Sequence, residues 1–274
     1  MKRILTLQDF SSMGRCSLTA AIPIISACGN EAVGLPTCLL STQTYGIEGY
    51  TFTDLEHNML PSFRHWQKLG IKFDCLYTGF LGSIPSLNAA IEIAKTLKNQ
   101  GAIIAVDPAM AEDGKLYSIF GQDYFERMKE LIGLCDIFLP NFTEGKMLAD
   151  IKSPLLPNKE NAVMLLKILE NKGLKKVVLS GIIDGSEMGT ATLENGVISF
   201  QFNGYYNKQI HGAGDILSSV IVSMVMKGLS LLEAAQRAVD FVHDCIDATI
   251  YENADLRFGL NFEKVLCKLT EKAN

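Results

Sequence analysis

The chain contains 274 residues, 48% hydrophobic and 20% charged, which is enough for one large buried core and excludes intrinsic disorder. Its net charge of −5 argues against nucleic acid or an anionic membrane as a partner, although a nest of backbone N–H groups can still bind phosphate. The seven cysteines form no Cys-x-x-Cys pair and no apolar run is long enough to span a bilayer, so we expect a cytoplasmic protein with reduced thiols.

Apolar stretches with strand character alternate with helix-period segments through residue 180. The expected strands lie at 3–7, 75–80, 102–108, 136–140 and 176–180. The expected helices lie at 17–29, 53–69, 84–99, 122–134, 143–149 and 158–172. This alternation predicts βαβ units and a mostly parallel sheet with helices on both faces.

The pattern changes after residue 181. Two strand-like runs, 189–193 and 197–202, flank an Asn195-Gly196 pair, which is a strong hairpin signal and predicts an antiparallel edge. Helical segments are then expected at 213–227, 230–250 and 261–271. No repeat or linker divides the sequence, so a single domain is the simplest interpretation.

A glycine turn precedes the apolar helix expected at 213–227. Gly212 and Gly214 flank Ala213, and Asp215 follows them at once. Asp215 can be a simple helix cap, because a carboxylate accepts hydrogen bonds from the free N–H groups of a first turn. Alternatively, the turn exposes those N–H groups to an anion and Asp215 lies beside it for proton transfer. This stretch by itself leaves both interpretations open.

Polar residues follow several of the expected strands. Ligands of open α/β sheets bind beyond the carboxyl ends of the strands, so these residues are candidates for one shared site. They include Asp9, Asp107, Asn141, Glu144 and Ser180. Each also has a structural explanation as a strand terminator, a turn or a helix start. The Gly-Lys pairs of the chain lack the following Ser or Thr that a phosphate-binding P-loop requires.

Five segments, taken together, match one known family in order. They are LTLQDFSSMGRCSL (5–18), YTGFLGS (77–83), VDPAMAEDGKLY (106–117), LPNFTEGKML (139–148) and HGAGDILSSVI (211–221). Through them the chain resembles the ribokinase superfamily and, within it, the pyridoxal (vitamin B6) kinases. The resemblance implies a ribokinase-like three-layer α/β/α fold with a mostly parallel central sheet, an antiparallel edge and no large lid domain. It also implies one kinase domain over residues 1–274.

The implied reaction is transfer of the γ-phosphoryl group of ATP to the 5′-hydroxymethyl group of pyridoxal, pyridoxine or pyridoxamine. Such a transfer requires positioning, neutralisation of charge and removal of the alcohol proton. By resemblance, Asp215 is the general base. The turn of Gly212, Ala213 and Gly214 would bind the transferring phosphate through its N–H groups, which the helix dipole supports.

The resemblance also implies Mg²⁺ as a cofactor beside ATP. Asp107 and Glu144 are expected to hold it through water, and Glu112 replaces a metal-linked Asp of the family with a longer arm. Magnesium takes a few carboxylates plus waters, so widely spaced acids suffice. The expected nucleotide-binding residues are Asp107, Asn141, Glu144, Ser180, Gly212 and Gly214.

For the vitamin, Asp9 stands where the family often hydrogen-bonds the pyridine ring or its 3-hydroxyl. Phe80 and Tyr45 are expected to stack against the ring. Thr44 and Glu48 lie on the loop that covers the substrate in the family. The adenine is expected against apolar residues of the last helices, which the sequence does not single out.

Two alternatives stay open at this point. Kinases that phosphorylate hydroxymethylpyrimidine, a thiamine precursor, share the framework and often carry an acid at the position of Asp9. A non-catalytic small-molecule sensor on the same fold is the other, because Ala213, Leu139 and Glu112 depart from the family pattern. The resemblance implies a homodimer, and the sequence leaves open the preferred vitamer and any monovalent-cation requirement.

Overall fold

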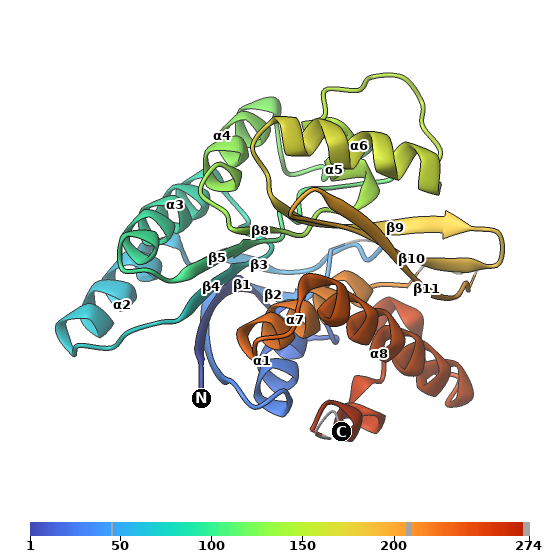
Figure 1. The fold of residues 1–274 in the computed structure, drawn as a ribbon. Helices are drawn as coiled ribbons and strands as arrows, with labels where there is room; N and C mark the ends of the chain where they lie inside the picture. The colour runs from blue at the N-terminus through green and yellow to red at the C-terminus, as the bar shows by residue number, and fades with distance from the viewer. Residues whose placement is uncertain (45, 207–209, 271–274) are drawn as a thin grey trace.

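The computed structural model describes residues 1–44, 46–206 and 210–270. A nine-stranded sheet lies between two layers of helices (Figure 1), in the strand order β11-β10-β9-β8-β5-β4-β1-β2-β3. Its strands are β1 (Arg3–Met13), β2 (Glu31–Thr42), β3 (Phe52–Asp54), β4 (Cys75–Thr78), β5 (Ile103–Val106), β8 (Ile137–Phe138), β9 (Lys176–Asp184), β10 (Glu187–Glu194) and β11 (Val197–Gly204). The helices are α1 (Ser17–Ala27), α2 (Glu56–Lys68), α3 (Ile84–Asn99), α4 (Gln122–Ile132), α5 (Phe142–Leu148), α6 (Lys159–Asn171), α7 (Ala213–Met226) and α8 (Leu231–Tyr251).

The centre of the sheet is parallel and both of its edges are antiparallel. β1 pairs in parallel with β2 and β4, and the parallel pairing continues from β4 through β5 and β8 to β9. β3 runs antiparallel to β2 at one edge, and β10 runs antiparallel to both β9 and β11 at the other. The three-layer architecture and the antiparallel hairpin at residues 187–204 confirm the fold expected from the sequence.

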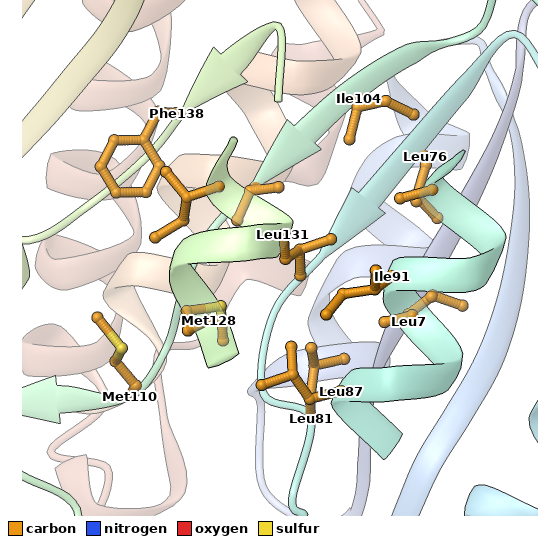
Figure 2. Packing of buried hydrophobic residues seen from close by; sticks show 14 of the residues in the cluster. Leu7, Leu76, Leu81, Leu87, Ile91, Ile104, Met110, Met128, Leu131 and Phe138 are labelled. Atoms are coloured by element: carbon orange, nitrogen blue, oxygen red, sulfur yellow. The ribbon is translucent and has the colours of Figure 1, made fainter. Parts of the chain in front are cut away.

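Helices cover both faces of the central strands, which explains their unbroken apolar sequence. Ile104, Ala105 and Val106 of β5 have no solvent exposure. One face packs against α2 to α6, and Figure 2 shows part of this core, with Ile91 of α3 and Leu131 of α4 among its members. The opposite face packs against α1, α7 and α8. Side chains therefore alternate between two separate cores along each strand.

The expected strands and helices up to residue 250 are confirmed within a few residues, but the last expected helix is wrong. Residues 261–270 form two short 3₁₀ turns, η2 (Phe262–Lys264) and η3 (Leu266–Leu269). The segment is tied to α8, because the backbone N–H of Asn261 donates to Thr249 Oγ1 and its amide donates to Glu252. Those anchors fix its path along α8, and a regular helix does not form.

The structure also contains a small hairpin at residues 111–116 that the sequence analysis does not predict. β6 (Ala111–Glu112) and β7 (Lys115–Leu116) pair around Asp113 and Gly114, both of which have positive φ. An Asp-Gly pair is a hairpin signal, although the strands here are only two residues long.

The seven cysteines are free thiols, five of them buried, as the sequence predicts. Within the part of the chain that the structure describes, no helix has the length and apolar character needed to cross a bilayer.

Candidate active site

A cavity of about 640 Å³ opens at the carboxyl ends of the parallel strands. Residues within or just after β1, β2, β4, β5, β8 and β9 all reach it, and the β10–β11 hairpin and α7 and α8 complete its wall. The sheet topology thus brings residues that lie up to 237 positions apart, Asp9 and Ile246, into one site. The expected residues that line it are Asp9, Thr44, Phe80, Asp107, Glu112, Asn141, Glu144, Ser180, Gly212, Ala213, Gly214 and Asp215.

Two expected residues are not placed at this cavity. Glu48 is exposed and does not line it. Tyr45 lies outside the described residues.

The glycine turn has a conformation that only glycine adopts easily. Gly212 is the N-cap residue of α7, with φ 73° and ψ −4°, which is the left-handed region. A Cβ atom on Gly212 would lie 2.3 Å from the carbonyl oxygen of Arg15, a backbone atom. A Cβ atom on Gly214 would meet nothing within 4 Å, because this residue faces the open cavity. The N-terminus of α7, with its unpaired N–H groups, therefore faces the cavity.

Asp215 lies in the first turn of α7, where it is half-buried and lines the cavity. Burial raises the pKa of Asp215 to about 7; a hydrogen bond from the backbone of Ser17 opposes this shift, and the charges of Asp107 and Asp9 add to it. Ser17 itself has a left-handed φ of 48°, unusual for serine, at the start of α1. A carboxyl group with a pKa near neutrality is suited to accept a proton at physiological pH.

Asp107 follows β5 and is held by two donors. Ser218 Oγ, one helical turn beyond Asp215, donates to Asp107 Oδ2 at 2.8 Å, and the backbone N–H of Ala109 donates to Oδ1 at 3.1 Å. Burial and then the charge of Glu144 raise the pKa of Asp107. Two acids that repel each other inside a cavity form a place where a cation is stabilised.

Glu144 and Asn141 form the capping box of α5. Asn141 Oδ1 accepts from the backbone N–H of Glu144, and Glu144 Oε2 accepts from that of Asn141, each at 2.9 Å. Glu144 Oε1 accepts further N–H groups from Met110 at 2.8 Å and Ala111 at 3.3 Å. The helix-start explanation is therefore correct for Glu144, whereas Asn141, expected as a turn residue, is the N-cap of the same helix; both also line the cavity.

The acids expected for Mg²⁺ fit a water-mediated site better than a direct one. In the described ranges, no group of three or more His, Cys, Asp or Glu side chains is close enough to hold a metal ion directly. Both oxygens of Glu144 already accept backbone N–H groups. Glu112 lines the cavity, and burial, followed by the charge of Asp113, raises its pKa. Mg²⁺ keeps several of its waters, so three acids around one cavity are consistent with it.

Asp9 is buried with 4% exposure and accepts a hydrogen bond from Ser11 Oγ at 2.7 Å. Burial raises the pKa of Asp9, and hydrogen bonds from Ser17 and Ser11 partly offset the shift. Phe80 lies beside Tyr117 and Phe120, with ring centroids 6.4 and 5.5 Å away. Asp9, Phe80 and Tyr117 all line the cavity.

The residues expected to contact the nucleotide were only partly predictable. Ser180 donates its backbone N–H to Pro140 at 3.0 Å and forms a bridge with Asn141, which brings it to the cavity. The sequence predicts apolar residues of the last helices at the site without singling them out, and the structure shows an apolar wall of α7 and α8 that faces the cavity. Its members are Leu217, Ile221, Val239, Val242 and Ile246. Their spacing is that of an ordinary core helix, so nothing in the sequence separates them from core residues.

Comparison with known proteins agrees with this architecture. The sequence pattern of the phosphomethylpyrimidine kinase family matches residues 13–257. The pyridoxal kinase PdxY of Burkholderia orbicola is 26% identical over 260 residues, 91% of this chain and 89% of that protein. The PdxY of Actinobacillus pleuropneumoniae is 26% identical over 187 residues, a match that spans 65% of this chain and 64% of that protein.

Solved structures match over the whole fold. A proposed phosphomethylpyrimidine kinase from Bacteroides thetaiotaomicron is 32% identical, covers 100% of this chain and 95% of its own, and superposes with a TM-score of 0.93. The pyridoxal kinase of Lactobacillus plantarum is 28% identical to this chain and superposes with a TM-score of 0.89. The match covers 98% of this chain and 96% of that protein.

A ribokinase-like sheet with an acid and a glycine turn at its carboxyl edge defines the class of the protein as a phosphotransferase. More narrowly, the chain belongs to the phosphomethylpyrimidine kinase family.

Proposed function

We propose that the protein phosphorylates the 5′-hydroxymethyl group of a B6 vitamer with ATP. The observation that carries the proposal is Asp215, three residues after the left-handed Gly212, which lines a cavity together with Asp9 and Phe80. The names of the relatives support it, since several are pyridoxal kinases and a crystal form of the Bacteroides protein contains pyridoxal.

In this mechanism the substrate CH₂OH lies between Asp215 and the γ-phosphate of ATP. Asp215 takes the hydroxyl proton as the oxygen forms its bond to phosphorus and the bond to the β-phosphate oxygen breaks. ADP leaves with the electron pair of that bond. The N–H groups after Gly212 stabilise the charge on the transferring group, and the dipole of α7 adds to this effect.

The remaining cavity residues bind and orient. Asp107, Glu112 and Glu144 would hold Mg²⁺ through water, and the ion would neutralise phosphate charge. Ser180 and Asn141 would contact the phosphates, and the apolar wall of α7 and α8 would cover the adenine.

For the vitamin ring, Asp9, oriented by Ser11, would accept a hydrogen bond from the protonated ring nitrogen or from the 3-hydroxyl. Phe80 would stack on the ring. Thr44 also lines the cavity. These contacts suit a flat heteroaromatic alcohol better than a sugar, whose hydroxyls need several polar partners.

Phosphorylation of hydroxymethylpyrimidine is the second candidate, favoured by the name of the matching family. Both substrates are flat heteroaromatic alcohols, and Asp9 could serve either ring. A panel of pyridoxal, pyridoxine, pyridoxamine and hydroxymethylpyrimidine with Mg·ATP, read as ADP release with mass spectrometry of the product, separates the two. We expect the highest kcat/KM with a vitamer; no turnover with any of the three removes the proposal.

Asp215→Asn tests the role of the acid and the non-catalytic alternative together. We expect turnover to fall about 10²- to 10⁴-fold while calorimetry shows unchanged ATP binding. Asp123→Asn is the matched control, because Asp123 is an exposed acid in the first turn of α4 and does not line the cavity. Turnover by Asp215→Asn equal to that of the control would exclude the proposed base.

We also propose that the protein forms a homodimer in the cytoplasm. Four large apolar side chains near the β1–β2–β3 edge are exposed, namely Phe10 (38%), Met13 (56%), Leu39 (43%) and Phe52 (42%). Phe10 and Leu39 lie opposite each other in the β1–β2 pair. A second copy that covers this edge would bury them. Sedimentation should give twice the mass of the chain, and a Leu39→Glu variant should sediment as a monomer.

A further inference from the structure

A group of buried polar side chains lies behind the cavity, between the sheet and α7. Thr6 and Gln8 of β1, Tyr77 of β4 and Ser219 of α7 have no solvent exposure. Five of their polar atoms have no hydrogen-bonding partner in the protein: Thr6 Oγ1, Gln8 Oε1, Gln8 Nε2, Tyr77 Oη and Ser219 Oγ. None of these residues lines the open cavity.

These side chains share one face of the sheet. Thr6 is paired with Tyr77 in the parallel β1–β4 register, and Tyr77 belongs to the core that packs against α1, α7 and α8. Alternation along β1 places Gln8 on the same face as Thr6. A Cβ atom on Gly79 would lie 2.9 Å from Gln8 Cγ, so the glycine leaves room for this side chain. Burial raises the pKa of Tyr77 well above its ordinary value, and the nearby Ser219 and Gln8 oppose this shift, although none of the three makes a full hydrogen bond to another.

The group lies next to the two acids of the site. Ser219 follows Asp215 by four residues, so both lie on one face of α7, one turn apart. After burial, the charges of Asp107 and Asp215 also raise the pKa of Tyr77. The residue before Ser219, Ser218, donates directly to Asp107. The polar group therefore lies beside the turn of α7 that carries Asp215 and Ser218.

Leaving five buried polar atoms without partners would be costly, because each loses its hydrogen bonds to water on folding. Buried side chains in this position are normally satisfied by internal water with two to four polar neighbours. The Ser219 hydroxyl, the Tyr77 phenol and the Gln8 amide can each donate and accept hydrogen bonds. They therefore suit a small neutral ligand such as water, which also donates and accepts.

We propose that Gln8, Tyr77 and Ser219 bind ordered water behind Asp215, and that Tyr77 and Ser219 act through it as positioning residues for that carboxylate. The second part rests on the proposed function. The water joins β1 and β4 to the first turns of α7, so loss of one hydroxyl loosens the placement of Asp215 without removing any group that touches the substrate.

Tyr77→Phe and Ser219→Ala test the proposal, since each removes one oxygen and little else. We expect kcat to fall about threefold to tenfold, the loss of roughly one net hydrogen bond, while KM for ATP and for the vitamer stays within about twofold. The double variant should lose less than the product of the two single effects, because both hydroxyls serve the same water.

Two controls match these changes. Tyr124 is another buried tyrosine whose hydroxyl has no partner in the protein, but it lies in the core on the opposite face of the sheet. Ser223 lies one turn beyond Ser219 on α7, and its hydroxyl donates to the Ser219 carbonyl at 2.7 Å. Tyr124→Phe and Ser223→Ala should keep wild-type kcat. Thermal unfolding of all four variants shows whether any loss of activity is a loss of folded protein.

A crystal structure that resolves ordered water decides the first part independently of activity. We expect density within hydrogen-bonding distance of Tyr77 Oη, Ser219 Oγ and the Gln8 amide, and its loss or displacement in Tyr77→Phe. Direct Tyr77–Ser219 or Tyr77–Gln8 bonds without water would overturn the binding site. A kcat for Tyr77→Phe equal to that of Tyr124→Phe would overturn the positioning role. If the wild-type protein phosphorylates none of the four alcohols, the proposed function fails, while the density still decides the water site.

Discussion

Replacing Gly212 with alanine is the sharpest test of the glycine turn. The new Cβ atom would lie 2.3 Å from the Arg15 carbonyl oxygen and 3.6 Å from Cys16 Cβ. Real Cβ contacts essentially never fall below 3.0 Å, so the turn or the Arg15 backbone must move by about 0.7 Å, the difference of these two distances. Alanine must also adopt the left-handed φ of 73°.

The two costs can be estimated separately. The left-handed conformation costs alanine about 1 kcal/mol relative to glycine, and the backbone contact adds a similar amount. We therefore expect Gly212→Ala to lower the free energy of unfolding by about 2 kcal/mol. The displaced turn carries Asp215 and the N–H groups that we propose bind the phosphate. A misplacement of about 1 Å costs on the order of 100-fold in rate, which is the loss of kcat/KM that we expect.

Two other glycines separate these effects. Gly185 has φ 59° and no atom within 4 Å of a new Cβ, so Gly185→Ala should lose about 1 kcal/mol of stability and no activity. Gly214 lies in the first turn of α7 with open space before it, so Gly214→Ala should fold normally but obstruct the phosphate, with a loss of about tenfold in kcat/KM for ATP. Urea unfolding and ADP release measure both quantities. Full activity in folded Gly212→Ala would refute the proposed role of the turn.

Three further outcomes are expected. Glu144→Ala leaves three backbone N–H groups without their acceptor and should lower the free energy of unfolding by about 3 kcal/mol in urea titration. Burial raises the pKa of Asp215 to about 7, which is above its value in the unfolded chain. The folded protein therefore favours the protonated carboxyl group. This contribution to stability is complete below about pH 4 and is lost as the pH rises through 7. The thermal midpoint of the metal-free protein should therefore fall from pH 5 to pH 8, and less so in Asp215→Asn. The same pKa predicts that kcat/KM falls below about pH 7, since Asp215 must be ionised to take a proton.

Much of this fold could be predicted from the sequence because strong local signals agree with the tertiary contacts. The helix expected at 84–99 is found over those residues, with Ser83 as a cap that accepts from Ser86 and Gly101 just past its end at φ 85°. The Asn195-Gly196 pair turns the β10–β11 hairpin as expected, with positive φ at both residues. Where such signals were weak, as at 261–271, the apolar spacing alone suggested a helix that does not form.

The site was predictable where a residue stands near the end of an expected strand or in the glycine turn before α7. Asp9, Asp107 and Ser180 lie near the ends of expected strands, so the topology of a parallel sheet places them together. The contact between Ser218 and Asp107 joins residues 111 positions apart and has no local signal. The clash that requires glycine at 212 comes from Arg15, which lies even further away in the sequence.

The helix-capping contacts between Glu144 and Asn141 determine how Glu144 could interact with a metal ion. Their reciprocal capping bonds start α5, and they also direct both Glu144 oxygens toward backbone N–H groups. A carboxylate with its oxygens so engaged contributes charge to the cavity but keeps little capacity for a direct metal bond, so any ion beside it retains its water. If the protein binds Mg²⁺ as proposed, the helix cap would favour an ion that keeps its waters, and three acids could then hold it without forming a close cluster in the described part of the chain.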